Sequence, residues 1–189
     1  MKPILFATGN SEKIAMAKNI CDREKILIEP IKLEIDEIQG EDPEVIVRDK
    51  VIKAYEITKR PTIVSDDSWC IPALNGFPGA YMKSINEWFE PEDFLRLMHG
   101  IEDRRVVCQQ YLAYMDGDLI KIFKNEIPGK FILEARGINK KSPNMSVIVL
   151  DADNGKTIAE VFEQGEDVVA ERYRNTRDVW HEFIEWYKS

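Results

Sequence analysis

Short apolar runs alternate with helix-spaced apolar residues along the first part of the chain. Residues 3–7 read as a buried strand that the polar triplet Thr8-Gly9-Asn10 interrupts, and Ser11 is placed to cap the helix that follows. One face of this predicted helix carries apolar residues at helical spacing: Ile14, Ala17, Ile20 and Cys21. Residues 25–35 are then rich in strand-forming side chains, with an interruption at Pro30.

A second helix is predicted to begin at Asp42-Pro43, with the acid at the cap and the proline in the first turn. It stops before Pro61, and its apolar stripe consists of Val47, Val51, Ala54 and Thr58. Residues 61–65 form a second buried strand in this prediction. That strand runs into the polar triplet Asp66-Asp67-Ser68, and a loop rich in glycine and proline follows at 75–79.

The middle of the chain predicts antiparallel strands. Residues 105–115 and 119–124 flank Asp116-Gly117, a hairpin signal, and further strands are expected at 131–133 and 146–150. A short helix is expected at 91–98 before Gly100, and the C-terminus is predicted to be helical, with an apolar face of Trp180, Phe183, Ile184 and Tyr187. The pattern predicts an α/β fold, with a mixed central sheet flanked by helices.

Length and charge narrow the class of protein. The 189 residues suit one domain, and the formal net charge of -8 (26 Lys and Arg against 34 Asp and Glu) disfavours a general nucleic-acid binder. No apolar stretch approaches the ~20 residues that cross a bilayer, and no signal-peptide pattern follows Met1, so we expect a cytoplasmic protein with no membrane partner. Three cysteines without a CxxC pair, namely Cys21, Cys70 and Cys108, indicate buried free thiols.

Polar residues follow the first predicted strand in a pattern that suits phosphate binding. The helix after Thr8-Gly9-Asn10 directs free N–H groups outward at its N-terminus, and Lys13 adds a positive charge in the first turn. Taken alone, the pattern is weak, and a generic strand–turn–helix unit with a surface lysine is the favoured interpretation of the same residues.

Two acidic clusters follow other predicted strands. Asp66-Asp67-Ser68 places two carboxylates side by side, which costs free energy unless a cation compensates, and such oxygen ligands suit Mg²⁺. Asp36-Glu37 follows the second predicted strand, and Lys53 lies on the helix after it. Solvated acidic turns and a surface lysine are the alternative interpretation. The clusters together suggest a site for a metal and a phosphate chain.

Other common chemistries are disfavoured. The chain has no GxxxxGK[ST] motif, so it is not a P-loop protein. Neither His99 nor His181 has a metal-ligand partner at a useful spacing, and Ser68 and Cys70 lack a candidate base in their sequence context.

Four segments in order resemble the inosine triphosphate pyrophosphatase family, the non-canonical purine nucleoside triphosphate pyrophosphatases. The segments are Phe6-Ala7-Thr8-Gly9-Asn10-Ser11-Glu12-Lys13, Glu37-Ile38-Gln39-Gly40, Val64-Ser65-Asp66-Asp67-Ser68 and Ala73-Leu74-Asn75-Gly76-Phe77-Pro78-Gly79-Ala80-Tyr81-Met82-Lys83. Weaker similarity continues at Arg136-Gly137 and at 156–160, so the resemblance covers most of the chain.

The resemblance implies a single two-lobed domain over residues 1–189, an elongated sheet and an active site in the cleft between the lobes. It implies a homodimer that hydrolyses a small-molecule nucleoside triphosphate to the monophosphate and pyrophosphate with Mg²⁺, for which Mn²⁺ can substitute. Glu37 and Asp67 match metal ligands, and Asp67 also matches the group that orients or deprotonates the attacking water. The catalytic set is then Asp67, Lys13 and Lys53, and the substrate-binding set is Thr8, Gly9, Asn10, Lys13, Lys53, Ser68, Lys83 and Arg172.

The chain departs from the family where the family binds the base. An aromatic-Gly-aromatic-Asp-Pro segment is replaced by Lys141-Ser142-Pro143-Asn144-Met145, and a later Ser-His-Arg by Ala170-Glu171-Arg172. If the alignment with the family is shifted, Arg174 or Arg177 matches the family's arginine instead of Arg172. Asp167 stands where the family has a lysine. These departures predict altered base specificity. They also motivate a rival function, that of a catalytically inactive nucleotide-binding or interaction protein on the same scaffold. Hydrolysis of another pyrophosphate-containing metabolite is a third alternative.

Overall fold

In a computed structural model, the described part of the chain comprises residues 2–139 and 142–189. Within helix α6 (Glu166–Asn175) the described side chains exclude those at 166–167 and 173–175. None of the helices in this part of the chain is long and apolar enough to cross a membrane.

The described strands form one sheet of seven strands. It is a mixed sheet, as the hydrophobic pattern predicts. The strand order is β2-β1-β3-β5-β6-β7, and β4 pairs with β3. Strand β1 pairs in parallel with β2 and β3, whereas β4 is antiparallel to β3 and β7 is antiparallel to β6. The strands are β1 (Ile4–Ala7), β2 (Ile28–Ile31), β3 (Thr62–Cys70), β4 (Pro78–Gly79), β5 (Arg105–Asp116), β6 (Leu119–Phe131) and β7 (Ile148–Leu150).

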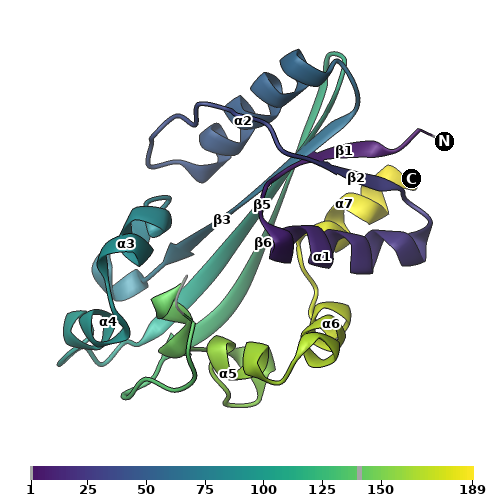
Figure 1. Cartoon of the computed structure of the whole chain (residues 1–189). Coiled ribbons are helices and arrows are strands. Elements are labelled where there is room, and N and C mark those ends of the chain that lie inside the picture. Colours follow the sequence, from purple (N-terminus) through teal and green to yellow (C-terminus); the bar gives the residue numbers. More distant parts are fainter. Residues whose placement is uncertain (1, 140–141) are drawn as a thin grey trace. The chain divides into compact units, whose positions relative to one another are not determined.

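Helices flank the sheet (Figure 1). Besides α6, they are α1 (Ser11–Cys21), α2 (Pro43–Thr58), α3 (Met82–Trp88), α4 (Pro91–Leu97), α5 (Ile158–Glu163) and α7 (Val179–Tyr187). The helices α1, α2, α4 and α7 lie where the sequence pattern predicts them. Helix α5 was not predicted as a separate helix, although Thr157 and Glu160 form a reciprocal capping box at its start.

The chain divides into two compact units. The first unit comprises Met1–Asp67, Gln110–Asn125 and Tyr173–Ser189, and the second comprises Ser68–Gln109 and Glu126–Arg172. The prediction that residues 1–189 act as a single two-lobed domain stays a prediction.

Aromatic side chains of α7 organise the core of the first unit. Trp180 and Phe183 are fully buried, and the Trp180 ring packs edge-on against Phe6 of β1 with a centroid separation of 5.0 Å. Helix α1 contributes Ala17 and Ile20 to the same core. Helix α2 packs three of the four residues of its predicted stripe into a neighbouring cluster with residues of the sheet, and Thr58 lies outside it. The cluster consists of Ala7, Val47, Val51, Ala54, Val64, Tyr111 and Ala113. These contacts pack α1 and α2 against β1 and β3.

The second unit has its own core. Phe94 of α4 stacks on Phe131 at a centroid separation of 6.3 Å, and β7 and α5 add apolar side chains to the cluster. Trp69, near the end of β3, is buried there too. Each unit therefore has a substantial apolar core of its own.

Three local predictions need correction. Strand β3 does not stop at residue 65 but continues to Cys70, so Asp66, Asp67 and Ser68 lie within the strand. Strand β6 likewise runs on to Phe131, because the chain keeps pairing with its neighbours beyond the predicted end. The cysteine thiols are free, as predicted, but Cys70 is only partly buried.

Candidate phosphate and metal site

The first unit holds two adjacent carboxylates in β3 beside a lysine of α1. The Lys13 ammonium lies 3.1 Å from Asp67 Oδ2 and 4.0 Å from Asp66 Oδ1, so one cation serves both acids. Asp66 also accepts a hydrogen bond from the Asp67 backbone N–H at 3.0 Å. Both carboxylates are about one third exposed, so water and a small ligand can reach them.

The residues before Lys13 form a polar turn that opens at the N-terminus of α1. Asn10, and not Ser11, caps this helix, because its Oδ1 accepts from the backbone N–H groups of Glu12 (2.9 Å) and Lys13 (3.3 Å). Thr8 supports the turn, since its Oγ1 accepts from the Asn10 N–H at 3.1 Å. The backbone N–H groups of Gly9 and Ser11 have no acceptor among the described residues, and both residues are exposed.

The backbone at Gly9 does not require glycine. Its φ lies outside the left-handed region, and an added Cβ would meet only the Lys32 side chain, at 3.8 Å or more. What the missing side chain leaves open is the approach to the turn's N–H groups.

Desolvation by the surrounding protein raises the pKa of Asp66 above its ordinary value. The positive charges of Lys13 and Lys50 lower the Asp66 pKa, whereas the negative charges of Asp67 and Glu37 raise it. The pKa of Asp66 therefore reports on the charge of the site, because four neighbouring ionisable groups act on it.

The loop after β2 is tied to α2 by two lysines. Glu37 forms an ion pair with Lys50, and Lys53 donates a 2.7 Å hydrogen bond to the carbonyl oxygen of Asp36. Lys53 also pairs with Asp49 one turn earlier, at 2.7 Å. Glu37 and Lys53 are thus brought to one place, as the sequence predicts. Lys50 was missed, although its position three residues before Lys53 puts it on the same helix face.

The donor set fits a hard divalent cation. No group of three His, Cys, Asp or Glu side chains in the described part of the chain is gathered closely enough to hold a metal alone. Mg²⁺, however, commonly takes only one or two protein carboxylates and completes its shell with waters and substrate phosphates. The half-exposed pair Asp66 and Asp67, within electrostatic range of Glu37, meets that requirement.

Two predicted substrate-binding residues belong to the second unit. Ser68 is buried, and its hydroxyl donates to Gln109 Oε1 at 3.3 Å, while Gln109 donates onward to Glu126 at 3.0 Å. Lys83, in the first turn of α3, is exposed, and its ammonium has no partner among the described residues. Lys83 is therefore free to contact a ligand, whereas the Ser68 hydroxyl is already bonded.

Arg172 forms an ion pair with an acidic residue that the sequence did not predict. Its Nε donates to Asp153 Oδ1 at 2.6 Å and its second terminal nitrogen to Oδ2 at 3.2 Å. The Asp153 side chain is 1% exposed and that of Arg172 is 15% exposed, so the pair is largely removed from water. The two residues lie 19 positions apart on different elements, and no sequence pattern connects them.

The other residues considered for base binding lie in several parts of the chain. Arg177 pairs with Glu182 (2.7 Å) and Glu185 (3.1 Å) of α7. Asn144 is buried, and its side-chain amide has no partner in the described part of the chain. Lys141 and the side chains of Arg174 and Asp167 lie outside the described residues.

Comparison with known proteins identifies relatives over nearly the whole chain. A model of the Ham1 family matches residues 4–181. A dITP/XTP pyrophosphatase of Methanopyrus kandleri is 30% identical over 187 residues, which cover 98% of this chain and 96% of that protein. A second dITP/XTP pyrophosphatase, from Saccharolobus solfataricus, is 35% identical over 130 residues, covering 69% of this chain and 68% of the relative.

A solved structure repeats the fold. The Ham1 protein of Staphylococcus aureus superposes with a TM-score of 0.76 over 99% of this chain and 98% of its own, at 20% sequence identity. Both the family resemblance and the mixed sheet flanked by helices are confirmed.

The charge environment of Asp66 generates a first prediction. In Lys13→Gln the pKa of Asp66 should rise further, because the nearest positive charge that lowers it is gone. Carboxyl ¹³C chemical shifts followed against pH measure this pKa. The matched variant Lys18→Gln, on the exposed face of the same helix, should leave the Asp66 titration unchanged. An Asp66 pKa that falls or stays constant in Lys13→Gln would contradict the assignment.

The buried ion pair generates a second prediction. Asp153→Asn leaves the Arg172 guanidinium largely buried without its counter-charge, and should lower the free energy of unfolding by about 3 kcal/mol. Asp103→Asn removes the acid of an exposed pair with Arg105, and should lower the free energy of unfolding far less, because solvent screens that pair. Urea denaturation measures both values, and equal losses in the two variants would show that burial does not matter here.

Proposed function

Because the chain belongs to the Ham1 family, we propose that it hydrolyses a nucleoside triphosphate to the nucleoside monophosphate and pyrophosphate. Membership makes it an enzyme of the nucleoside triphosphate pyrophosphatase class, which acts on phosphoric anhydrides. The observation that carries the proposal is the half-exposed carboxylate pair of β3 beside Lys13, at the open N-terminus of α1.

The phosphate chain binds at the turn before α1. The unpaired N–H groups of Gly9 and Ser11 donate to phosphoryl oxygens, and the positive end of the α1 dipole favours negative charge there. Thr8 and Asn10 hold the turn in shape. Lys13 and Lys53 contribute positive charge from α1 and α2. These cations stabilise the charge that develops on the pyrophosphate leaving group.

Asp67 orients the attacking water. Its carboxylate accepts a proton from a water molecule as the water oxygen forms a bond to the α-phosphorus. The bond between the α-phosphorus and the bridging oxygen breaks at the same centre, and the electron pair leaves with pyrophosphate. Lys13 pairs with Asp67 before substrate arrives, since the ammonium lies 3.1 Å from Asp67 Oδ2.

We assign the metal-binding role to Glu37 and Asp67. Mg²⁺, or Mn²⁺ in its place, would supply Lewis-acid neutralisation of the phosphoryl oxygens. The negative charge of Asp66 would then act on the bound metal ion from the neighbouring position. Glu37 would leave its ion pair with Lys50 to bind the metal.

We further propose that base specificity is altered. The buried carboxylate of Asp153 binds the Arg172 guanidinium with two hydrogen bonds, so these donors are satisfied within the protein. A site that loses hydrogen bonds to a base edge discriminates less strongly among bases. We also propose that the protein is a cytoplasmic homodimer and that its binding partner is the small-molecule nucleotide.

A turnover screen tests the proposed function. The protein is incubated with Mg²⁺ or Mn²⁺ and a panel of ITP, XTP, dUTP and modified pyrimidine triphosphates, and pyrophosphate is detected. Asp67→Asn should lower the rate with the best substrate at least about 100-fold, because a neutral amide cannot accept the proton of water. The control Asp118→Asn, in the exposed turn after β5, should keep the full rate.

The same screen decides between the proposal and its rivals. Stabilisation by nucleotides without pyrophosphate at any metal concentration would establish the non-catalytic binding function instead. Release of inorganic phosphate in place of pyrophosphate would indicate a different phosphatase. Full turnover by Asp67→Asn would contradict the role assigned to that residue.

A further inference from the structure

Lys32 follows β2 and lies beside the turn that precedes α1. Strands β1 and β2 are parallel and pair as far as Ala7 and Ile31, and the Thr8 N–H then donates to the Ile31 carbonyl oxygen at 3.0 Å. Thr8 and Lys32 therefore leave the sheet side by side. The stem of Lys32 borders Gly9, because a Cβ added to this glycine would lie 3.8 Å from Lys32 Cγ and 3.9 Å from both Cδ and Cε. The Lys32 ammonium, one bond beyond Cε, is thus placed next to the turn.

The Lys32 side chain is exposed, and its ammonium has no partner among the described residues. The lysines around the carboxylate pair differ in this respect, because Lys13, Lys50 and Lys53 each contact a protein oxygen atom. An anion that binds these three lysines has to displace that oxygen. An anion that binds Lys32 breaks no ion pair in the described part of the chain, so this ammonium is directly available to a phosphoryl group.

The order of the strands puts Lys32 and the acids on opposite sides of the turn. Strand β1 lies between β2 and β3. The turn after β1 therefore has Lys32 on its β2 side, and Asp66 and Asp67 on its β3 side. Neighbouring strands are about 4.8 Å apart, which separates β2 from β3 by about 10 Å. A triphosphate chain that lies across the turn can reach the acids with one end and the Lys32 side chain with the other.

We propose that Lys32 binds the two phosphates that leave as pyrophosphate. The inference rests on the proposed function and adds a direction to it: the α-phosphorus lies at Asp67, and the β- and γ-phosphates extend toward β2. The chemistry fits this direction, because Asp67 acts on the water that attacks the α-phosphorus, whereas negative charge accumulates on the leaving group. The Lys32 ammonium stabilises that charge as the bond to the bridging oxygen breaks.

Calorimetric titration of the whole chain with pyrophosphate in the presence of Mg²⁺ tests the inference. Lys32→Gln should raise the dissociation constant of pyrophosphate at least about fivefold, because one charged hydrogen-bond donor is lost. Lys32→Arg keeps the charge and should lose far less affinity. Unchanged pyrophosphate binding by Lys32→Gln, or no measurable binding by the parent, would overturn the inference.

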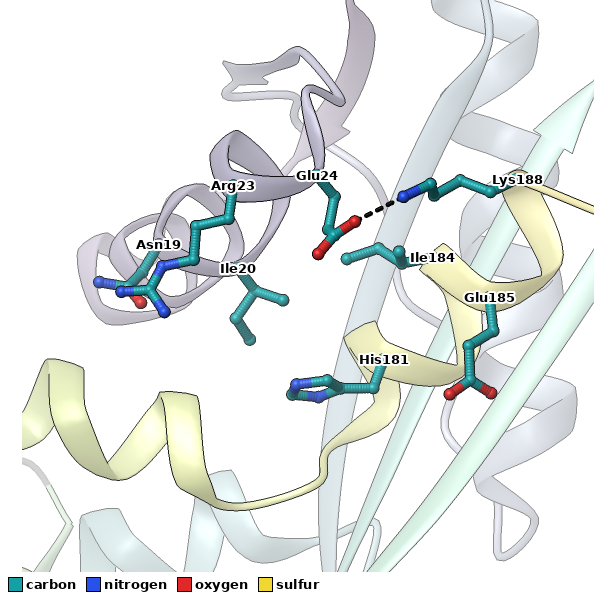
Figure 2. Close-up of a pocket in the computed structure, with 8 residues that line it drawn as sticks. All are labelled: Asn19, Ile20, Arg23, Glu24, His181, Ile184, Glu185 and Lys188. Atoms are coloured by element: carbon teal, nitrogen blue, oxygen red, sulfur yellow. Dashed lines mark hydrogen bonds and ion pairs between the residues drawn. The ribbon is translucent and has the colours of Figure 1, made fainter.

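A matched control removes one positive charge elsewhere on the same unit. Arg23 is also exposed, and it lies in the turn Asp22–Glu24 at the opposite end of α1 (Figure 2). Arg23→Gln should bind pyrophosphate as the parent does, because the site of the phosphates lies at the other end of the helix. Equal weakening in Arg23→Gln and Lys32→Gln would show that only the net charge matters, and would overturn the inference.

A second ligand tests the direction of the phosphate chain. Inosine monophosphate carries the α-phosphate alone, so Lys32→Gln should bind it no more weakly than the parent does. If Lys32→Gln weakens the binding of inosine monophosphate as much as that of pyrophosphate, the proposed direction is wrong.

Turnover distinguishes this inference from the proposed function, since the titrations need no hydrolysis. If the parent releases no pyrophosphate from any nucleotide of the panel, the proposed function itself fails. If the parent is active and Lys32→Gln binds pyrophosphate as tightly as the parent, the proposed function stands and the assignment of Lys32 alone is overturned.

Discussion

The site depends on one electrostatic compensation, that of Asp66 and Asp67 by the Lys13 ammonium. Two neighbouring carboxylates on a partly buried strand repel each other, and desolvation raises the pKa of Asp66. Lys13 can reach both because α1 is capped at Asn10, which fixes the first turn, and because Ala17 and Ile20 anchor the rest of the helix in the core. The hydrophobic packing of α1 thus places the positive charge that lowers the pKa of Asp66, a residue of another element.

The same arrangement explains how an acidic chain can bind a polyanion. The net charge of -8 is a property of the whole surface, whereas phosphate is attracted by the local field. Around the carboxylate pair, Lys13, Lys50 and Lys53 each sit against an acid or a carbonyl oxygen. In the proposed reaction these lysines exchange protein oxygens for phosphoryl oxygens.

The sequence predicted those features that rest on local pattern. Apolar spacing located β1, α1, α2 and α7. Because Thr8, Lys13, Glu37 and Asp67 lie at the ends of predicted strands and helices, the sequence also predicted that several of these four residues share a site. Features that depend on contacts distant in sequence were not predictable. Strand β3 continues through the triplet Asp66-Asp67-Ser68 because neighbouring strands keep pairing with it. The ion pair between Asp153 and Arg172 forms only when the fold brings the two residues together.

The central claim is that water attacks the α-phosphorus of a nucleoside triphosphate at the carboxylate pair. Hydrolysis in H₂¹⁸O, followed by ³¹P NMR of the products, tests it most directly. The account predicts that the ¹⁸O label enters the nucleoside monophosphate and that the pyrophosphate stays unlabelled. Label in the pyrophosphate, or inorganic phosphate as the first product, would contradict the account.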